Sequence, residues 1–551
     1  MGKYKKKSSK NTSRDTKATN HKRTKKSMRQ DEEDEKDNKV HSTGYTNCKS
    51  KDFGECELEI LRNAVIKIEA KKGEEITNTA EVKEIINIVE NFIKDNKLVC
   101  YGGTAINNIL PKRDQFYNFD VEMPDYDFFS SDAMQDAKKL ADVYKKNGYD
   151  EVLATAGTHY GTYKVFVNFI PVADITQMSK EVYDVVQKEA INVAQIKYTP
   201  PNFLRMLMYL EISRPGGDVS RWEKVQKRLN ALNKNYPLKL KSCAAGKLQS
   251  GFKFDKEKAL KIHKCIRDAI TDNGFIFFGG YATYLYSRFM SSSIKKKFNR
   301  ENSQFDILAK DVNKAEILIK ERLMDKYIDE KNINIIQHEP VGSITLQIVP
   351  EHTEVKVNNQ TVCLIYKPVN CHSYNEIEVD NVKYKIATID TMLSFFLSFI
   401  YSKRDYFNRE RILCMADFLY NVQQKNRLSQ KGILKRFNID CYGTGITKED
   451  LRQEKSEAFK TLKSKQNTIE YDRWFLKYRP AGDHVEDTEW KKFSEKELLT
   501  MLKKVKKGEN KENDKKTTTN DKQTAKNDKQ TTKKRKKRHS KGKKTRKWLV
   551  F

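Results

Sequence analysis

An internal repeat constrains the fold of this 551-residue chain more than any other sequence feature. The first copy contains LVCYGGTAINNIL at 98–110, and the second copy contains FIFFGGYATYLYS at 275–287. Each segment is an apolar run, followed by Gly-Gly and then by a pattern typical of a helix. Segment 192–213 also matches segment 381–402 without a gap. Self-similarity in a fixed order predicts a duplicated domain.

Two shorter pairs of segments follow the same order in both copies. DYDFF at 125–129 corresponds to QFDIL at 304–308, and FIPVADI at 169–175 corresponds to YKPVNCH at 366–372. Within the first copy, apolar residues recur at helical spacing before the Gly-Gly turn, and they alternate along 164–170 as in a strand. We therefore expect an α/β (α+β) fold in which helices flank a mixed sheet.

Composition separates the middle of the chain from its ends. Hydrophobic residues make up 38% of the chain, and the two ends contain few of them, so only the middle can bury a core. The expected parts are a disordered basic tail (1–50), a short N-terminal region (51–80), the first copy (81–245), the second copy (246–430), a helical region of unknown role (431–502) and a disordered Lys/Arg-rich tail (503–551).

The charge of the chain points to a polyanionic partner. There are 106 basic and 75 acidic residues, which gives a formal net charge of +31. The C-terminal tail contains KKRKKRHSKGKKTRK, which could bind RNA phosphates, act as a localisation signal or remain only a solvated tail. By charge alone, nucleic acid and an anionic membrane surface both qualify as partners.

The first candidate site element is the turn Gly102-Gly103-Thr104. Glycine lets the backbone adopt a positive φ and approach a ligand closely. The start of the following helix offers free N–H groups, which favour a bound phosphate. Taken alone, this pattern also fits an ordinary strand-to-helix turn.

The second candidate element is the carboxylate pair Asp125 and Asp127. Residues i and i+2 of a strand point to the same face, and two adjacent carboxylates repel each other unless a cation lies between them. Mg²⁺ prefers such hard oxygen ligands. An exposed acidic turn is the alternative, and Asp120 with Glu122 forms a rival pair at the same spacing. The repeat favours Asp125 and Asp127, because it aligns them with QFDIL.

The third candidate element is Asp174, which lies between Ala173 and Ile175 near the end of a predicted strand. A lone acid in such a place is often a cap or turn residue. Here it would supply the third carboxylate that a two-metal site for phosphoryl transfer requires.

These three elements together resemble the polymerase-beta-like nucleotidyltransferase superfamily. YGGTAIN followed by DYDFF, with a degenerate second copy, is similar to the poly(A) polymerase catalytic subunits of poxviruses and giant DNA viruses, over about residues 80–430. The resemblance implies a duplicated nucleotidyltransferase domain that uses Mg²⁺ or Mn²⁺ to transfer AMP from ATP to an RNA 3′ hydroxyl without a template.

The resemblance also assigns roles to the candidate residues. Gly102, Gly103 and Thr104 would hold the triphosphate of ATP. The acids would hold the metals: Asp125, Asp127 and Asp174. Asp174 would lie nearest the attacking 3′ hydroxyl.

The second copy departs from this pattern. It keeps Gly279-Gly280, but Gln304 replaces the first acid and leaves Asp306 alone, and NCH at 370–372 offers no third acid. One carboxylate cannot hold two divalent metals. We therefore expect the second copy to be inactive and to serve as a scaffold and an RNA-binding wall.

Two clusters downstream of the third acid have open interpretations. Lys197, Tyr198, Asn202 and Arg205 could contact the triphosphate or base, or simply form a positively charged helix start. The segment 221–228 combines Arg and Lys with Trp222, which suits single-stranded RNA but also fits a helix with one buried Trp.

The remaining expectations concern compartment, partners and competing functions. Nine cysteines without a CxxC pair suit an intracellular, reducing compartment, and the apolar run 392–400 is too short to span a bilayer, so no membrane partner is expected. If the protein is viral, the host cytoplasm (viral factory) or the virion is its expected location.

The resemblance implies that the RNA 3′ end and ATP are partners. It also implies either self-association as a homodimer or a separate processivity partner. A terminal nucleotidyltransferase of other specificity, such as a uridylyltransferase, and a non-catalytic RNA-binding processivity subunit are the alternatives.

Overall fold

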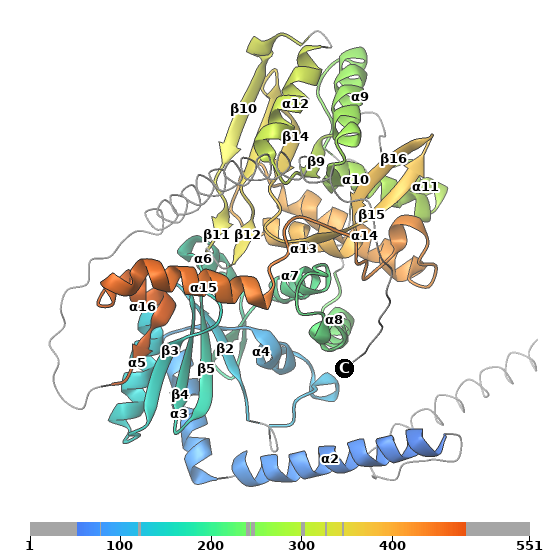
Figure 1. The fold of residues 1–551 in the computed structure, drawn as a ribbon. Coiled ribbons are helices and arrows are strands. Elements are labelled where there is room, and N and C mark those ends of the chain that lie inside the picture. The colour runs from blue at the N-terminus through green and yellow to red at the C-terminus, as the bar shows by residue number, and fades with distance from the viewer. Residues whose placement is uncertain are drawn as a thin grey trace, which may run out of the picture.

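The computed structural model describes residues 52–480, apart from 78, 120–122, 239–242, 244–247, 249, 299–302, 326–327 and 344–345. The predicted basic tails, 1–50 and 503–551, and the rival acids Asp120 and Glu122 lie outside the described residues. Two eight-stranded mixed sheets with flanking helices form the body of the protein (Figure 1). The expected α/β fold is confirmed.

The first sheet belongs to the first copy of the repeat. Its strands are β1 (Val99–Cys100), β2 (Tyr126–Ser130), β3 (Val152–Ala156), β4 (Thr162–Val167), β5 (Ile170–Gln177), β6 (Ile191–Val193), β7 (Ile196–Tyr198) and β18 (Lys477–Tyr478). Its order is β18-β3-β4-β5-β2-β1-β7-β6. The helices of this half, with one N-terminal helix before them, are α2 (Phe53–Thr77), α3 (Ala80–Asp95), α4 (Gly102–Ile109), α5 (Ala133–Lys146), α6 (Lys180–Lys188), α7 (Pro201–Ile212) and α8 (Trp222–Asn235).

The second sheet belongs to the second copy. Its strands are β8 (Ile276–Phe278), β9 (Phe305–Leu308), β10 (Ile333–His338), β13 (His352–Val357), β14 (Gln360–Tyr366), β15 (His372–Val379), β16 (Val382–Ala387) and β17 (Cys441–Tyr442). Its order is β10-β13-β14-β9-β8-β16-β15-β17. Its helices are α9 (Lys256–Asp272), α10 (Gly279–Tyr286), α11 (Ser292–Lys295), α12 (Val312–Met324), α13 (Ile389–Phe399) and α14 (Arg409–Asn426). A small separate sheet pairs β11 (Val341–Gly342) with β12 (Gln347–Val349).

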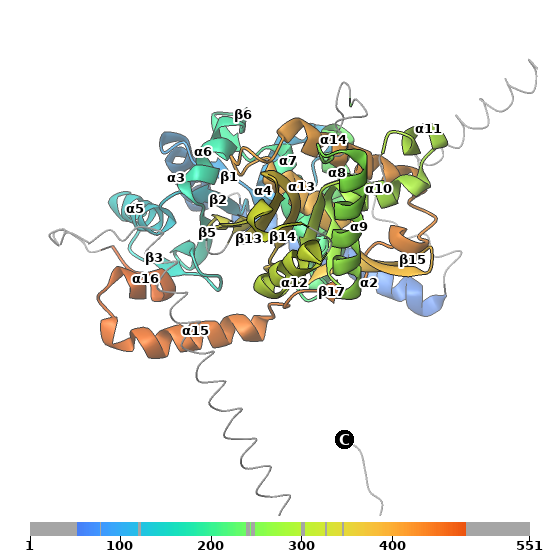
Figure 2. The same cartoon turned by 90° about the horizontal axis from the view of Figure 1, so that it is seen from above.

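The sheet topology confirms the duplication. The order β3-β4-β5-β2-β1-β7-β6 repeats as β10-β13-β14-β9-β8-β16-β15. The directions also agree, since β1 pairs antiparallel with β2 and parallel with β7, as β8 does with β9 and β16. β2 pairs parallel with β5, as β9 does with β14. Seen from above, α5 and α9 lie on opposite sides of α4 (Figure 2).

The topology corrects one of the four expected matches between the copies. The counterpart of β5 is β14, which ends at Tyr366, so 366–372 is not equivalent to FIPVADI. Most of 366–372 is the loop that leads from β14 into β15. The sequence match arose from a shared Pro-Val, and strand pairing overrides it. The residue of β14 that lies opposite Asp306 is Leu364.

One expected strand also ends earlier than its alternation predicts. Asn168 and Phe169 have positive φ values of 48° and 66°, so the chain turns there from β4 into β5. Phe169 is 83% exposed and does not join the buried face that Val165 and Val167 form. The helix predicted before the Gly-Gly turn is confirmed as α3, which buries Val82 and Val89.

The two copies meet along their equivalent last helices. α7 packs against α13, and the Phe203 and Tyr401 rings lie 5.0 Å apart between centroids. Every side chain of α13 is buried, so the apolar run around Met392 is a core helix. No helix among the described residues is long and apolar enough to cross a membrane.

The region after the second copy returns to the first. α15 (Lys448–Leu462) and α16 (Ile469–Phe475) lie beside the first sheet, and β18 extends that sheet by pairing with β3, while β17 extends the second sheet (Figure 1). Short 3-10 helices connect the elements: η1 (Lys112–Asp114), η2 (Val219–Arg221), η4 (Ser287–Phe289), η5 (Glu330–Asn332), η6 (Gly432–Leu434) and η7 (Lys463–Lys465).

Four cysteines that are far apart in the sequence pair in the fold. Cys243 bonds to Cys414, and Cys371 bonds to Cys441. The scattered spacing of the cysteines had suggested that they are unpaired, but these four form disulfide bonds. The expectation of a reducing compartment stays a prediction.

Candidate active site

The Gly-Gly turn requires glycine for two separate reasons. Tyr101 is extended, and Gly102 begins α4 with a φ of +74°, which L side chains rarely adopt. A Cβ at Gly102 would also lie 3.1 Å from Cγ of Asp127. The turn thus reverses the chain directly beside a carboxylate.

Thr104 links this turn by a hydrogen bond to the start of β2, where Asp125 and Asp127 lie. Its side chain is 2% exposed, and its Oγ1 donates a hydrogen bond of 2.7 Å to the backbone oxygen of Asp125. The backbone N–H of Tyr101 donates to the backbone oxygen of Asp127 at 2.9 Å. Thr104 therefore positions an acid, while its predicted contact with a triphosphate stays a prediction.

The strand pairing brings the three predicted acids together. β2 and β5 are parallel neighbours, and their register places Asp127 directly beside Asp174. Asp125 immediately precedes β2, two residues before Asp127, so the two carboxylates share a face. The arrangement concentrates three carboxylates from two adjacent strands at the Gly-Gly turn.

The charges at this site disfavour three ionised carboxylates. Burial raises the pKa of Asp127 to about 8, and the charges of Asp125 and Asp174 add to the effect. Burial also raises the pKa of Asp125, again with a contribution from Asp174. Nearby cations, Lys164 above all, lower both pKa values in part. A bound cation would therefore be strongly favoured here.

Lys164 is a site residue that the sequence reasoning missed. It lies on β4 directly opposite Asp174 in the antiparallel register, and its Nζ forms an ion pair with Oδ2 of Asp174. The alternation of β4 contained the signal, because Val165 and Val167 face the core and Lys164 must face the other way.

The acids fit a divalent metal by their chemistry. They offer only carboxylate oxygens, the ligands that Mg²⁺ and Mn²⁺ prefer. Across the described ranges of 52–480, no three His, Cys, Asp or Glu side chains are arranged as ligands of one ion, and Asp174 is paired with Lys164 instead. For Asp174 to bind a metal through Oδ2, the ion would have to replace the Lys164 ammonium group there.

The first of the two downstream clusters has a structural role in this fold. Arg205 is 1% exposed and donates to Oδ1 of Asn233 at 2.6 Å, to the Asn202 side chain and to the backbone oxygen of Tyr236. It therefore anchors the end of α8 and is not a surface cation. Tyr198 is also buried, and its hydroxyl accepts a hydrogen bond from Asn108 at 2.8 Å.

Comparison with known proteins shows what the part of the chain that carries this site is similar to. Residues 87–218 match the family model described as "Poly(A) polymerase catalytic subunit". Proteins provisionally named poly(A) polymerase catalytic subunits are similar over the same part of the chain. One, from African swine fever virus (isolate Pig/Kenya/KEN-50/1950), is 30% identical over 167 residues, which are 29% of this chain and 35% of the relative. Another, from Acanthamoeba polyphaga mimivirus, is 30% identical over 203 residues, or 36% of this chain and 34% of the relative.

The match to these relatives therefore spans about a third of their length. A solved structure, titled "Crystal structure of the Megavirus polyadenylate synthase", has a similar fold with a TM-score of 0.64. The likeness covers 76% of this chain and 86% of that one at 20% sequence identity. The resemblance expected from the Gly-Gly turn and the acid strand is confirmed. Residues 87–218 are thus similar to the family of poly(A) polymerase catalytic subunits.

Proposed function

We propose that this protein is a template-independent poly(A) polymerase that transfers AMP from ATP to the 3′ hydroxyl of an RNA. One observation carries the proposal. Asp127 and Asp174 lie side by side on parallel strands next to the Gly102 turn, with Asp125 on the same face. The similar viral proteins bear the name of this activity, which supports the choice of ATP and RNA.

In the proposed reaction, the 3′ oxygen of the RNA attacks the α-phosphorus of ATP. A new O–P bond forms, the bond between the α-phosphorus and the bridging oxygen of the β-phosphate breaks, and pyrophosphate leaves with that electron pair. Bound divalent metal, Mg²⁺ or Mn²⁺, would lower the pKa of the hydroxyl and neutralise charge on the leaving group. Asp125, Asp127 and Asp174 would hold it, and Asp174 would lie nearest the attacking oxygen.

The proposal assigns different roles to the parts of the chain. The first copy, 81–245, carries the chemistry, and the second copy, 246–430, supports it as a scaffold. The tail 503–551 would contact RNA phosphates by charge. The part of the segment 431–502 that the structure describes, up to residue 480, would join the two copies, since β17 and β18 add to different sheets.

The partners and setting follow from the same proposal. The protein would act on RNA 3′ ends in the host cytoplasm or the virion of a large DNA virus. It would work as a homodimer or with a separate processivity partner, as the resemblance to the viral catalytic subunits implies.

Incubation of the full chain with a labelled oligo RNA, Mg²⁺ and one nucleoside triphosphate at a time tests the function. We expect a ladder of added residues with ATP and little extension with UTP, CTP or GTP. Preferential extension with UTP would identify a uridylyltransferase instead. Binding of RNA without extension by any nucleotide would favour the non-catalytic processivity subunit.

A further inference from the structure

Three basic residues of η2 and α8 face the candidate active site. Arg221, Lys224 and Arg228 are spaced i, i+3 and i+7, so they share one side of the helix. Lys227 points elsewhere, is exposed and pairs with Glu223 at 2.8 Å. The helix therefore presents one basic face and carries an unrelated lysine that serves as an internal control.

Arg228 lies directly over the Gly-Gly turn. A Cβ at Gly103 would be 2.8 Å from Nη2 of Arg228 and 2.5 Å from the hydroxyl of Tyr117. The guanidinium and the hydroxyl therefore lie close against the backbone of the turn. Arg228 donates a hydrogen bond to that hydroxyl, and its guanidinium carbon lies 5.1 Å from the centroid of the Phe116 ring.

The other two cations act on the acids themselves. Lys224 is among the cations near Asp125, and Arg221 is among those near Asp127, although burial keeps the pKa of both acids raised. Arg221 also pairs with Glu211 at 3.3 Å. The basic face thus extends from the neighbourhood of the carboxylates to the Gly-Gly turn.

Arg228 is the cation on this face with most freedom to take a new acceptor. Among the described residues, no carboxylate lies within 4 Å of its guanidinium. Its planar fork suits two phosphate oxygens at once, which an ammonium group does not. The neutral Tyr117 hydroxyl is a weaker acceptor than a phosphate oxygen.

The aromatic loop beside Arg228 is held in place by a buried amide. Oδ1 of Asn107, which is fully buried, accepts the backbone N–H groups of Phe116 at 2.8 Å and of Tyr117 at 2.9 Å. The ring of Phe116 therefore forms a fixed platform for the guanidinium, which reduces the entropy lost when Arg228 binds an anion.

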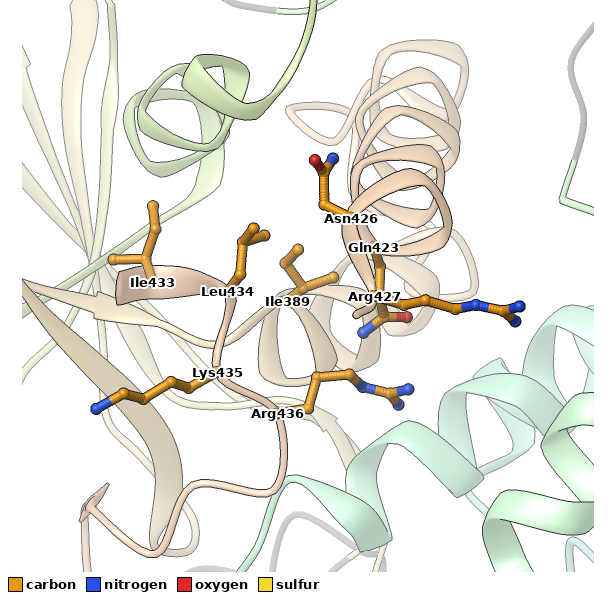
Figure 3. A pocket seen from close by; sticks show the side chains of 8 residues that line it. All are labelled: Ile389, Gln423, Asn426, Arg427, Ile433, Leu434, Lys435 and Arg436. Carbon is orange, nitrogen blue, oxygen red and sulfur yellow. The ribbon is translucent and has the colours of Figure 1, made fainter. Parts of the chain in front are cut away.

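The second copy fixes the position of α8. Arg436 donates to Oε1 of Gln226 on α8 at 3.2 Å and to Oδ1 of Asp390 at 3.0 Å. Gln423 donates to the same Asp390 oxygen at 3.0 Å, and Asp390 is 2% exposed. Figure 3 shows Arg436 and Gln423 in the small pocket from which this contact reaches α8. Arg436, which follows the second copy and is held by its Asp390, thereby links α8 to the second copy.

We propose that Arg228, supported by Lys224 and Arg221, binds the β- and γ-phosphates of the incoming nucleotide over the Gly102-Gly103 turn. The inference rests on the proposed function, because it assumes that the turn receives a nucleoside triphosphate. In the bound state, the phosphate oxygens replace the Tyr117 hydroxyl as acceptors for the guanidinium.

Calorimetric titration of the RNA-free full chain with Mg²⁺ and ATP, ADP or AMP tests the proposal. We expect Arg228→Gln, which keeps most of the packing against Phe116, to weaken ATP binding by at least about tenfold and AMP binding by less than about twofold. Arg228→Lys should fall between wild type and Arg228→Gln. Lys227→Ala, the matched control, should bind all three nucleotides as the wild type does.

A second variant and a second ligand separate the alternatives. Tyr117→Phe removes the hydroxyl but keeps the cation, so its ATP affinity should equal or exceed that of the wild type. An equal loss of ATP and AMP affinity in Arg228→Gln would overturn the proposal. So would unchanged ATP affinity combined with weakened binding of a fluorescent oligo RNA, which would make this face an RNA surface.

The test also distinguishes this inference from the proposed function. If the wild type binds ATP through Arg228 but adds no AMP to RNA, the function is wrong and the phosphate contact stands. If the wild type adds AMP and Arg228→Gln binds ATP normally, the function stands and the contact is wrong.

Discussion

The two copies of the repeat place the same turn beside very different neighbours. Gly102 has a φ of +74° and lies against Asp127, and Gly279 has a φ of +67° and lies against Asp306. On the next strand, however, Asp174 of the first copy corresponds to Leu364 of the second. The turn and one acid were kept, while the acid opposite was replaced by an apolar residue.

The two copies also differ on the next strand of each sheet, which is β4 in the first copy and β13 in the second. Lys164 lies opposite Asp174, whereas Glu354 lies opposite Leu364. Glu354 is buried and is bound by His338 at 3.1 Å and Lys356 at 3.3 Å, so its charge is used within the sheet. The comparison teaches that the turn belongs to the fold, because both copies keep it, while the set of three acids and a lysine belongs to the first copy alone.

Removal of one acid of the first copy should have the largest effect. Asp127→Ala deletes a carboxylate that the proposed metals require and leaves the core intact, so nucleotide addition should fall by about a thousandfold or more. Extension of a labelled RNA by ATP measures the loss, and the melting temperature checks the fold. More than about a tenth of wild-type activity in a folded variant would refute the site. Asp120 and Glu122 would then be the acids to test.

Conversion of the first copy toward the second should be almost as severe. Asp174→Leu installs the residue that the second copy carries at the equivalent place, and it also leaves Lys164 without its carboxylate. We expect at least about a hundredfold loss of single-nucleotide addition. Asp174→Asn is the control for shape, and it should lose activity to a similar degree because the charge is what matters. Wild-type activity in either folded variant would exclude Asp174 from the chemistry.

Local pattern and spacing predicted the fold and the three acids, because these depend on short-range features. Gly102 marks a turn, and the i, i+2 pair Asp125 and Asp127 marks one face of a strand. What the sequence could not supply was strand order. Leu364 becomes the partner of Asp306 only when β14 pairs with β9, and Lys164 meets Asp174 only through the register of β4 and β5.

Arg228 shows the same limit over a longer distance in the sequence. The sequence showed that Arg228 lies in a basic segment. The contact of Arg228 with the turn at Gly103, however, depends on how α8 packs. That packing involves Arg205 from within the first copy and Arg436 from the segment after the second copy. Contacts of such long range are set by tertiary packing, which single-sequence patterns do not contain.

The lone acid of the second copy should cost stability at neutral pH. Burial raises the pKa of Asp306 to about 7, although Arg411 and the backbone N–H of Gly280 lower it in part. The pKa of an unfolded Asp is about 3.9, so the folded state binds the proton more tightly, and the free energy of unfolding falls as pH rises from about 4 to about 7. Asp306→Asn removes the ionisation and should stabilise the protein above pH 7, by on the order of 1 to 4 kcal/mol.

Urea unfolding of wild type and Asp306→Asn at pH 5 and pH 8 measures this effect. The variant should gain about 1.5 kcal/mol at pH 5, about one unit above the unfolded pKa, and about 4 kcal/mol at pH 8, where the folded carboxyl has ionised as well. An equal difference at both pH values would show that the change acts through packing and that Asp306 does not titrate as described.

The smallest effect on catalysis should come from the same position. Asp306→Ala should leave ATP-dependent RNA extension within about twofold of wild type, because Gln304 and Leu364 supply no further carboxylate for a metal. Asp127→Ala, assayed beside it, is the matched variant at the equivalent place of the first copy. If Asp306→Ala lost activity as Asp127→Ala does while melting normally, the second copy would take part in the chemistry. The distinction between a retained turn and a retained site would then fail, since one acid beside Gly279 would be enough for catalysis.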